Sequence, residues 1–217
     1  MKKTLLLISF VFGLGSSAWA IPISPCASGT LADYDVSGFS CTIGDLTFSD
    51  FSYIPSASGG ALAPDASGVS VTPITTGEIG LEFNAAWLVI DGQTIDAPIT
   101  YDVTSTSADI SDLTLEMVGT ATAPGAASVA ETASNGENLG VTPSDFMQTK
   151  TFSPVDALTL RKDIGVSGGA LGDGGSAHIS YVYNLFSETS TVPEPSMLLL
   201  CGGLLAFLPI ARRKFVG

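Results

Sequence analysis

Short runs in which apolar and polar residues alternate are the most restrictive feature of this 217-residue sequence. Alternation with a period of two places every second side chain on the same face of a strand. Residues that form helices well, such as Lys, Arg, Gln and Glu, are scarce, and no stretch shows a convincing 3.6-residue period. Turn residues bound the alternating runs, which cover 47–53, 79–90, 99–103, 113–117, 157–166 and 179–185.

This pattern predicts an all-β domain, an antiparallel β-sandwich of about seven to ten strands. A parallel sheet would need helical crossovers between its strands, and no such segment is visible. The Gly-rich stretches 56–60 and 167–176 are expected to be long loops. Segment 121–140 has only Val129 and Leu139 as clear core candidates, so an edge strand and a loop are expected there.

The first 20 residues have the organisation of a secretory signal peptide. Two lysines near the start precede an apolar run over 5–14, and Ala18-Trp19-Ala20 forms an A-x-A cleavage signal. The sequence therefore predicts export, with Ala18 and Ala20 directing cleavage and the β-sandwich domain occupying residues 21–190.

The last residues have the organisation of a membrane-directed signal. Residues 197–211 are apolar and uncharged, and at a rise of 1.5 Å per residue they reach about 22 Å, short of a hydrocarbon core of about 30 Å. A single transmembrane helix that is held briefly fits this length better than a permanent anchor. A Pro-Glu-Pro triplet, formed by Pro193, Glu194 and Pro195, precedes the run. A basic cluster, formed by Arg212, Arg213 and Lys214, follows it.

Residues 191–217 resemble the PEP-CTERM sorting signal of Gram-negative bacteria, because the triplet, the apolar span and the basic cluster occur in that order at the C-terminus. The resemblance implies that an exosortase recognises Pro193, Glu194 and Pro195 and processes the chain near them. It also implies an inner-membrane intermediate with the basic cluster retained on the cytoplasmic side, consistent with the positive-inside rule. The cell surface or the extracellular space would be the destination.

The domain before this tail resembles other proteins more loosely. Segment 38–53 is similar to the opening of many uncharacterised β-rich PEP-CTERM proteins, which carry a Cys-x-x-Gly-Asp/Asn-x-Thr-Phe-x-x-Phe pattern. This resemblance implies a β-sandwich and no known activity. Proteins with the tail are typical of bacteria that make exopolysaccharide, so exopolysaccharide is a possible partner beside the exosortase and the export machinery.

Charge excludes one class of partner. All 21 acidic residues lie between Asp33 and Glu194, and five of the eight basic residues lie in the two terminal signals. Only Lys150, Arg161 and Lys162 remain in the exported domain. A surface this acidic repels nucleic acid and anionic lipid head groups, so no nucleic-acid partner is expected.

The three cysteines divide between the domain and the tail. Cys26 and Cys41 both lie in the exported domain, where a disulfide between them is expected. Cys201 lies in the apolar run, where it is either a small apolar residue of the helix, a lipid-attachment site or a contact for a processing enzyme.

Catalytic signals are weak. The single histidine, His178, lies in a predicted strand, and no G-x-S-x-G elbow is present. Glu78, Glu82 and Glu116 are the candidates for a pair of hydrolytic carboxylates, yet each also fits the polar face of a strand. No enzymatic activity is expected, and a secreted hydrolase is the third-ranked alternative.

Calcium is the only metal with candidate ligands. Asp33 and Asp35 form one pair of carboxylates, and Asp91 and Asp96 flank a turn, but neither segment matches an EF-hand or a calcium-binding repeat. No cofactor is therefore predicted, with calcium kept as an alternative.

Two functions of different classes remain. The first is a structural or adhesive matrix protein, and the second is a carbohydrate-binding module. A module would stack sugar rings on exposed aromatic side chains, for which the candidates are Trp87, Tyr101, Tyr181 and Tyr183. Trp87 lies in an apolar run and is expected in the core. Strict alternation would place Tyr181 and Tyr183 in the core with Ile179, and His178 on the opposite face.

Overall fold

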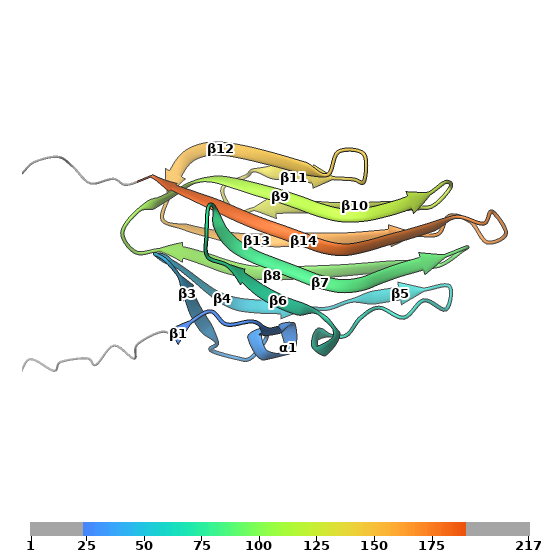
Figure 1. The fold of residues 1–217 in the computed structure, drawn as a ribbon, viewed down its shortest axis with the longest axis horizontal. Helices are drawn as coiled ribbons and strands as arrows, with labels where there is room; N and C mark the ends of the chain where they lie inside the picture. Colours follow the sequence, from blue (N-terminus) through green and yellow to red (C-terminus); the bar gives the residue numbers. More distant parts are fainter. Residues whose placement is uncertain (1–23, 190–217) are drawn as a thin grey trace, which may run out of the picture.

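The computed structural model describes residues 24–189, which form two β-sheets packed face to face (Figure 1). The signal peptide, the Pro-Glu-Pro triplet, the apolar run, Cys201 and the basic cluster lie outside the described residues. Within residues 24–189, no helix has the length and apolar character needed to cross a membrane.

The larger sheet has the strand order β1-β3-β4-β8-β13-β10-β11, and β5 also pairs with β8. All of its pairs are antiparallel except β1 with β3. The bounds of its strands are β1 Ser24–Pro25, β3 Ser40–Ile43, β4 Leu46–Tyr53, β5 Ser56–Ser58, β8 Thr94–Ser105, β10 Ala126–Ala133, β11 Asn138–Val141 and β13 Ala157–Ser167.

The six-stranded sheet has the order β12-β9-β14-β7-β6-β2 and is antiparallel throughout. Its strands are β2 Gly29–Thr30, β6 Ser70–Ile74, β7 Ile79–Ile90, β9 Asp109–Thr122, β12 Met147–Val155 and β14 Ser176–Thr189. A four-residue helix, α1 (Leu31–Tyr34), and a 3-10 turn, η1 (Ala66–Gly68), lie together at one edge of the sandwich (Figure 1).

The predicted β-sandwich is confirmed, and all six predicted alternating runs are strands. The expected seven to ten strands are too few, because residues 24–189 form 14 strands, several of them only two to four residues long. The inner faces supply one continuous apolar core, whose largest members are fully buried: Phe48, Phe83, Trp87, Tyr101 and Phe186. Alternation identified most of these strands because they bury one face and leave the other face polar, which is the condition for a period of two. The end of β7 is the exception, because Leu88 and Ile90 are apolar and exposed.

Two predictions about loops need correction. Residues 56–58 form the short strand β5 on the edge of β8, so the expected loop over 56–60 is partly a strand. In segment 121–140, β10 is an internal strand between β13 and β11, and only β11 is at the edge. The internal place of β10 in the sheet was not evident from the sequence, because most of its side chains are small. Its buried residues nevertheless alternate: Ala127, Val129, Glu131 and Ala133. The loop expected over 167–176 is confirmed for residues 168–175, while the residues at its two ends belong to β13 and β14.

A β-bulge in β14 reverses the expected orientation of two tyrosines. The register of β14 shifts between Ile179 and Tyr181 against both of its neighbours, β7 and β9. Since an extra residue moves all later side chains to the opposite face, Tyr181 and Tyr183 lie on the outer face while Val182 points inward. The prediction that the two tyrosines face the core is therefore wrong.

Candidate functional site

The outer face of the six-stranded sheet carries a pair of parallel aromatic rings. The ring centroids of Tyr181 and Tyr183 are 6.1 Å apart with an interplanar angle of 13°. Both residues are only partly buried, because they lie two positions apart on the outward side of β14. The strand thus presents two stacked rings to solvent on a central strand of the sheet.

Acidic and amide side chains border these rings on the neighbouring strands. Tyr183 lies directly opposite Glu82 on β7 and Glu116 on β9, while Tyr181 lies opposite Asn84 on β7. We call this group the tyrosine face: Tyr181, Tyr183, Glu82, Asn84 and Glu116. Directly opposite residues on paired strands have Cβ atoms about 4.5–5.5 Å apart, so the five side chains form one contiguous surface.

The electrostatics of the tyrosine face keep Tyr183 protonated. Partial burial raises the pKa of Tyr183, and the nearby Glu82 and Glu116 carboxylates raise it further because they disfavour a phenolate. A protonated hydroxyl and two carboxylates together offer both donors and acceptors beside an aromatic surface. A shallow hollow continues this surface past Glu116, lined also by Val118, Pro143 and Phe146.

The other two aromatic candidates for sugar stacking do not reach solvent. Trp87 and Tyr101 have exposed fractions of 0%. Trp87 lies in the core as expected, and its Nε1 donates to the Tyr53 hydroxyl at 3.4 Å. The suggestion that Tyr101 forms part of a sugar platform is wrong, because its strand turns that side chain between the sheets.

The hydrolytic candidates do not assemble around a cleft. Glu78 lies exposed in the turn before β7, whereas Glu82 and Glu116 lie on the open tyrosine face with Tyr183 between them. His178 faces outward from β14, as expected, opposite Leu88 and Thr120. None of the residues directly opposite it on these strands is a nucleophile paired with a carboxylate.

The four calcium candidates lie in two separate places, and hydrogen bonds within the domain engage the carboxylates of Asp33 and Asp91. Asp33 accepts hydrogen bonds from the backbone N–H and the hydroxyl of Thr30, both at 2.8 Å, which caps α1. Asp35 is the residue that ends α1. Asp91 accepts from the N–H groups of Gly172 and Gly174 at 2.7 and 3.1 Å, and so fixes the predicted glycine-rich loop. Over residues 24–189, no three metal-ligating side chains gather at one point.

The fourth candidate, Asp96, is paired with another acid. A hydrogen bond with the Asp163 carboxyl, then partial burial and the charge of Asp163, raise the pKa of Asp96 above its ordinary value of 3.8, while Arg161 opposes the shift. Arg161 Nη2 lies 3.5 Å from Asp163 Oδ2. The positive charge of Arg161 therefore offsets the negative charge of both Asp96 and Asp163.

Replacing Asp96 by a neutral residue should stabilise the domain at neutral pH. A raised pKa means that the folded state binds the Asp96 proton more tightly than the unfolded state, so folding loses stability as pH rises through the interval above 3.8. We expect Asp96→Asn to raise Tm slightly at pH 7, and we expect the difference to vanish in acid below that interval. Thermal unfolding at several pH values measures this, and an unchanged difference across the series would contradict it.

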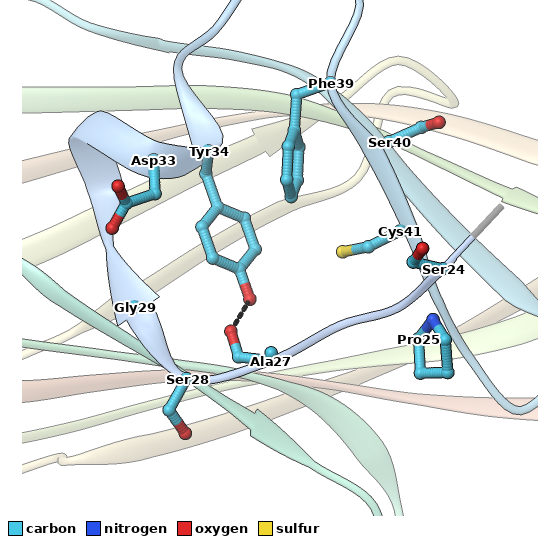
Figure 2. Close-up of a pocket in the computed structure, with 10 residues that line it drawn as sticks. All are labelled: Ser24, Pro25, Ala27, Ser28, Gly29, Asp33, Tyr34, Phe39, Ser40 and Cys41. Atoms are coloured by element: carbon cyan, nitrogen blue, oxygen red, sulfur yellow. Dashed lines mark hydrogen bonds between the residues drawn. The ribbon is translucent and has the colours of Figure 1, made fainter.

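A second depression lies beside the predicted disulfide, which is confirmed between Cys26 and Cys41. Figure 2 shows the pocket, with the Tyr34 hydroxyl donating to the Ala27 carbonyl at 2.6 Å and Phe39 beside it. The Asp33 carboxylate lies on the far side of Tyr34 from Cys41 (Figure 2). Thr30 donates two hydrogen bonds to Oδ2 of this carboxylate, and the rest of the pocket lining carries no charged side chain.

The sequence analysis missed a set of polar residues inside the sandwich. Glu131, Lys162 and Asn184 are 1%, 0% and 0% exposed, and together with Tyr101 they form what we call the buried polar cluster. Burial, and then the charge of Glu131, raise the pKa of Tyr101 well above its ordinary value. One signal was present in the sequence: Lys162 occupies the apolar phase of the run that buries Leu158, Leu160, Ile164 and Val166.

Comparison with known proteins gives no family. No family model matches the chain, and no curated protein matches it. Three solved structures show a weak similarity to parts of the chain. The first is TmCBM61 in complex with β-1,4-galactotriose, with 13% identity and a TM-score of 0.30 over 62% of this chain and 88% of the other.

The second is the enzymatically active domain of bacteriophage CBA120 tailspike protein 4, with 14% identity and a TM-score of 0.26 over 59% of this chain and 19% of that one. The third is a family two carbohydrate esterase from Cellvibrio japonicus, with 14% identity and a TM-score of 0.20 over 67% of this chain and 38% of the other. Scores this low establish neither a shared fold nor a shared ligand.

Proposed function

We propose that this chain is an exported cell-surface or matrix protein that binds polysaccharide through its tyrosine face. The observation that supports this is the outward pair of parallel rings at Tyr181 and Tyr183, bordered by Glu82 and Glu116. Aromatic faces pack against the apolar C–H faces of sugar rings, and carboxylates and amides accept hydrogen bonds from sugar hydroxyls. The role is adhesion and not catalysis, because the two carboxylates flank a ring on an open sheet.

The charge of the face selects among glycans. Glu82 and Glu116 lie on either side of Tyr183, and the exported domain has few cations to offset its acidic residues. A polysaccharide rich in uronic acids would be repelled at this surface. Neutral hexose polymers, or polymers with amino sugars, are the ligand class that this face suits.

The carbohydrate proposal has a direct test. We expect the exported protein to bind neutral glycans on an array, and we expect Tyr181→Ala with Tyr183→Ala to weaken Kd at least about tenfold, since truncating an aromatic anchor costs about 2 kcal/mol or more. Tyr181→Phe with Tyr183→Phe keeps both rings and should retain most of the binding. Leu62→Ala is the matched control, because this side chain is 90% exposed and belongs to a different surface. A blank array, or full binding by the double alanine variant, would refute the proposal.

Export is supported by two independent features. The disulfide between Cys26 and Cys41 fits an oxidising compartment. The resemblance of residues 191–217 to a PEP-CTERM signal supplies the route, in which an exosortase processes the inner-membrane form near Pro193, Glu194 and Pro195.

Processing is checked separately from glycan binding. We expect Pro193→Ala with Glu194→Ala to leave the full-length chain in the inner membrane, because the proposed recognition triplet is lost. The secreted wild-type chain should lack the residues from 197 onward when its intact mass is measured. Recovery of the full-length chain from the cell surface would argue against processing and would leave the sugar-binding result unaffected.

A further inference from the structure

The buried polar cluster places charged side chains in the core, where they are usually unfavourable for stability. The exported domain has only three basic residues, and one of them, Lys162, has no exposed surface at all. Burying a charged pair usually stabilises a protein less than apolar residues of similar size would. The cluster also joins the two sheets, because Glu131 and Lys162 are paired across β10 and β13 in one sheet while Asn184 comes from β14 in the other.

The lysine amine lies against the side-chain amide of the asparagine. Lys162 Nζ is 2.5 Å from Asn184 Oδ1. Because Oδ1 is bonded directly to Cγ, the amine lies beside the carbonyl carbon from the opposite sheet. Both side chains are confined by close-packed strands, so this proximity persists in the folded state.

Glu131 contacts the amine and the amide nitrogen at the same time. One carboxylate oxygen, Oε2, accepts from Lys162 Nζ, and the other, Oε1, accepts from Asn184 Nδ2 at 3.0 Å. A single carboxylate that bridges an amine and an amide nitrogen can take a proton from the first and deliver one to the second. Glu131 thus occupies the position of a proton-transfer group between a nucleophile and its leaving group.

The carbonyl oxygen of Asn184 also has a dedicated donor. The Tyr101 hydroxyl donates to Asn184 Oδ1, while Asn184 Nδ2 donates to the Thr114 carbonyl at 3.3 Å. Donors aimed at Oδ1 polarise the carbonyl and stabilise negative charge that develops on its oxygen during attack. The amide is therefore fixed with its oxygen toward donors and its nitrogen toward acceptors.

Burial disfavours the charged form of the lysine amine, although the aromatic rings beside it attract a cation. Lys162 Nζ lies 6.0 and 5.9 Å from the ring centroids of Phe83 and Tyr101. Burial lowers the pKa of Lys162, with the Glu131 carboxylate opposing that effect, so the unprotonated amine needed for attack is more accessible than at a surface. Water is excluded, which protects a product amide from hydrolysis.

We propose that Lys162 and Asn184 are joined by an amide bond between Nζ and Cγ, which the folded chain forms by itself with Glu131 as the proton-transfer group. Glu131 first takes a proton from the Lys162 ammonium. The Nζ electron pair then attacks Cγ, and the carbonyl electrons move to Oδ1, where the Tyr101 hydroxyl holds them. Glu131 gives its proton to Nδ2 and takes the second proton from Nζ.

When the carbonyl re-forms, the Cγ–Nδ2 bond breaks and ammonia leaves, or ammonium if it carries away the remaining Glu131 proton. Atoms and charge balance without any oxidant or cofactor. If ammonia leaves, Glu131 keeps the remaining proton and both charges of the original pair are lost. If ammonium leaves, Glu131 remains a carboxylate and only the lysine charge is lost. In either case a neutral amide ties β13 to β14. The two sheets are then linked covalently through the centre of the sandwich, a device suited to a protein that works outside the cell.

Mass spectrometry of the full chain tests the amide. The reduced wild-type protein should be lighter by one ammonia molecule than the mass calculated for its observed termini. Chymotryptic cleavage at Tyr181 and Tyr183 separates Asn184 from Lys162, and a branched peptide joining the two should be found. A free Lys162 amine and no branched peptide would overturn the proposal.

Variants separate this reaction from other losses of ammonia. A cyclic imide at Asn135-Gly136 would also remove ammonia, but it would persist in Lys162→Met and would give no branched peptide. Asn184→Asp should reach the same linked product with loss of water, since an acid and an amine condense to the same amide. Glu131→Gln should remain unlinked while circular dichroism shows a folded β protein, and linkage as complete as in wild type would overturn the role assigned to Glu131.

Discussion

Replacing Glu131 with alanine is expected to lower the free energy of unfolding by about 3–5 kcal/mol, the range for removing one partner of a buried ion pair. The substitution leaves Lys162 without its carboxylate in a site with no exposed surface. It also removes the acceptor that Asn184 Nδ2 contacts. Because the variant lacks the proposed proton-transfer group, it should also remain unlinked, and its loss relative to a linked wild type should lie at or above the top of this range. Chemical denaturation followed by tryptophan fluorescence measures the change.

Two comparisons identify the cause of that loss. Arg161→Ala alters the neighbouring residue, whose guanidinium is 55% exposed and pairs with Asp163 at the surface, so it should cost less than about 1 kcal/mol. Adding Lys162→Met to Glu131→Ala removes the unpaired charge and should recover part of the stability. If Glu131→Ala costs no more than Arg161→Ala, the pair does not stabilise the fold.

Alternation in the sequence was sufficient to predict the strands of the sandwich. It was not sufficient to predict which side chains of β14 face the core and which face outward. Alternation predicts a strand wherever one face is buried, and the burial of Ala157–Val166 follows it without interruption. In β14 the bulge after Ile179 adds one residue, and no residue type in that segment marks its position. The same shift that turns Tyr181 and Tyr183 outward turns Asn184 inward, so both proposed sites were hidden by one irregularity.

The two charged members of the buried polar cluster, Lys162 and Glu131, were hidden for an additional reason. Lys162 and Glu131 lie at core positions of their strands, but charged residues are read as surface residues unless a partner is known. Their pairing depends on the register of β10 with β13, which are separated in the sequence by β11 and β12. A lysine in the apolar phase of a strand is the local signal, and it becomes meaningful only when tertiary structure supplies Glu131 and Asn184.

Removing the disulfide with Cys26→Ala and Cys41→Ala is expected to lower the free energy of unfolding by about 3 kcal/mol. The bond closes a loop with a sequence separation of 15 residues, and a crosslink of this length restricts the unfolded chain by about that amount in the chain-entropy model. The loop contains α1 and its capping box, and Tyr34 packs against Phe39 and Phe51 there.

Reduction of the wild-type protein provides the matched control for this loss. Wild-type protein in reductant should unfold at the same denaturant concentration as the double alanine variant, and the variant itself should not respond to reductant. Hydrogen exchange should rise first between residues 26 and 41, because the antiparallel ladders of both sheets remain intact when the bond is cut. Equal stability of oxidised wild type and variant would show that β1 and α1 are held by packing alone, in which case the stability of the sandwich resides in its core and in the buried polar cluster.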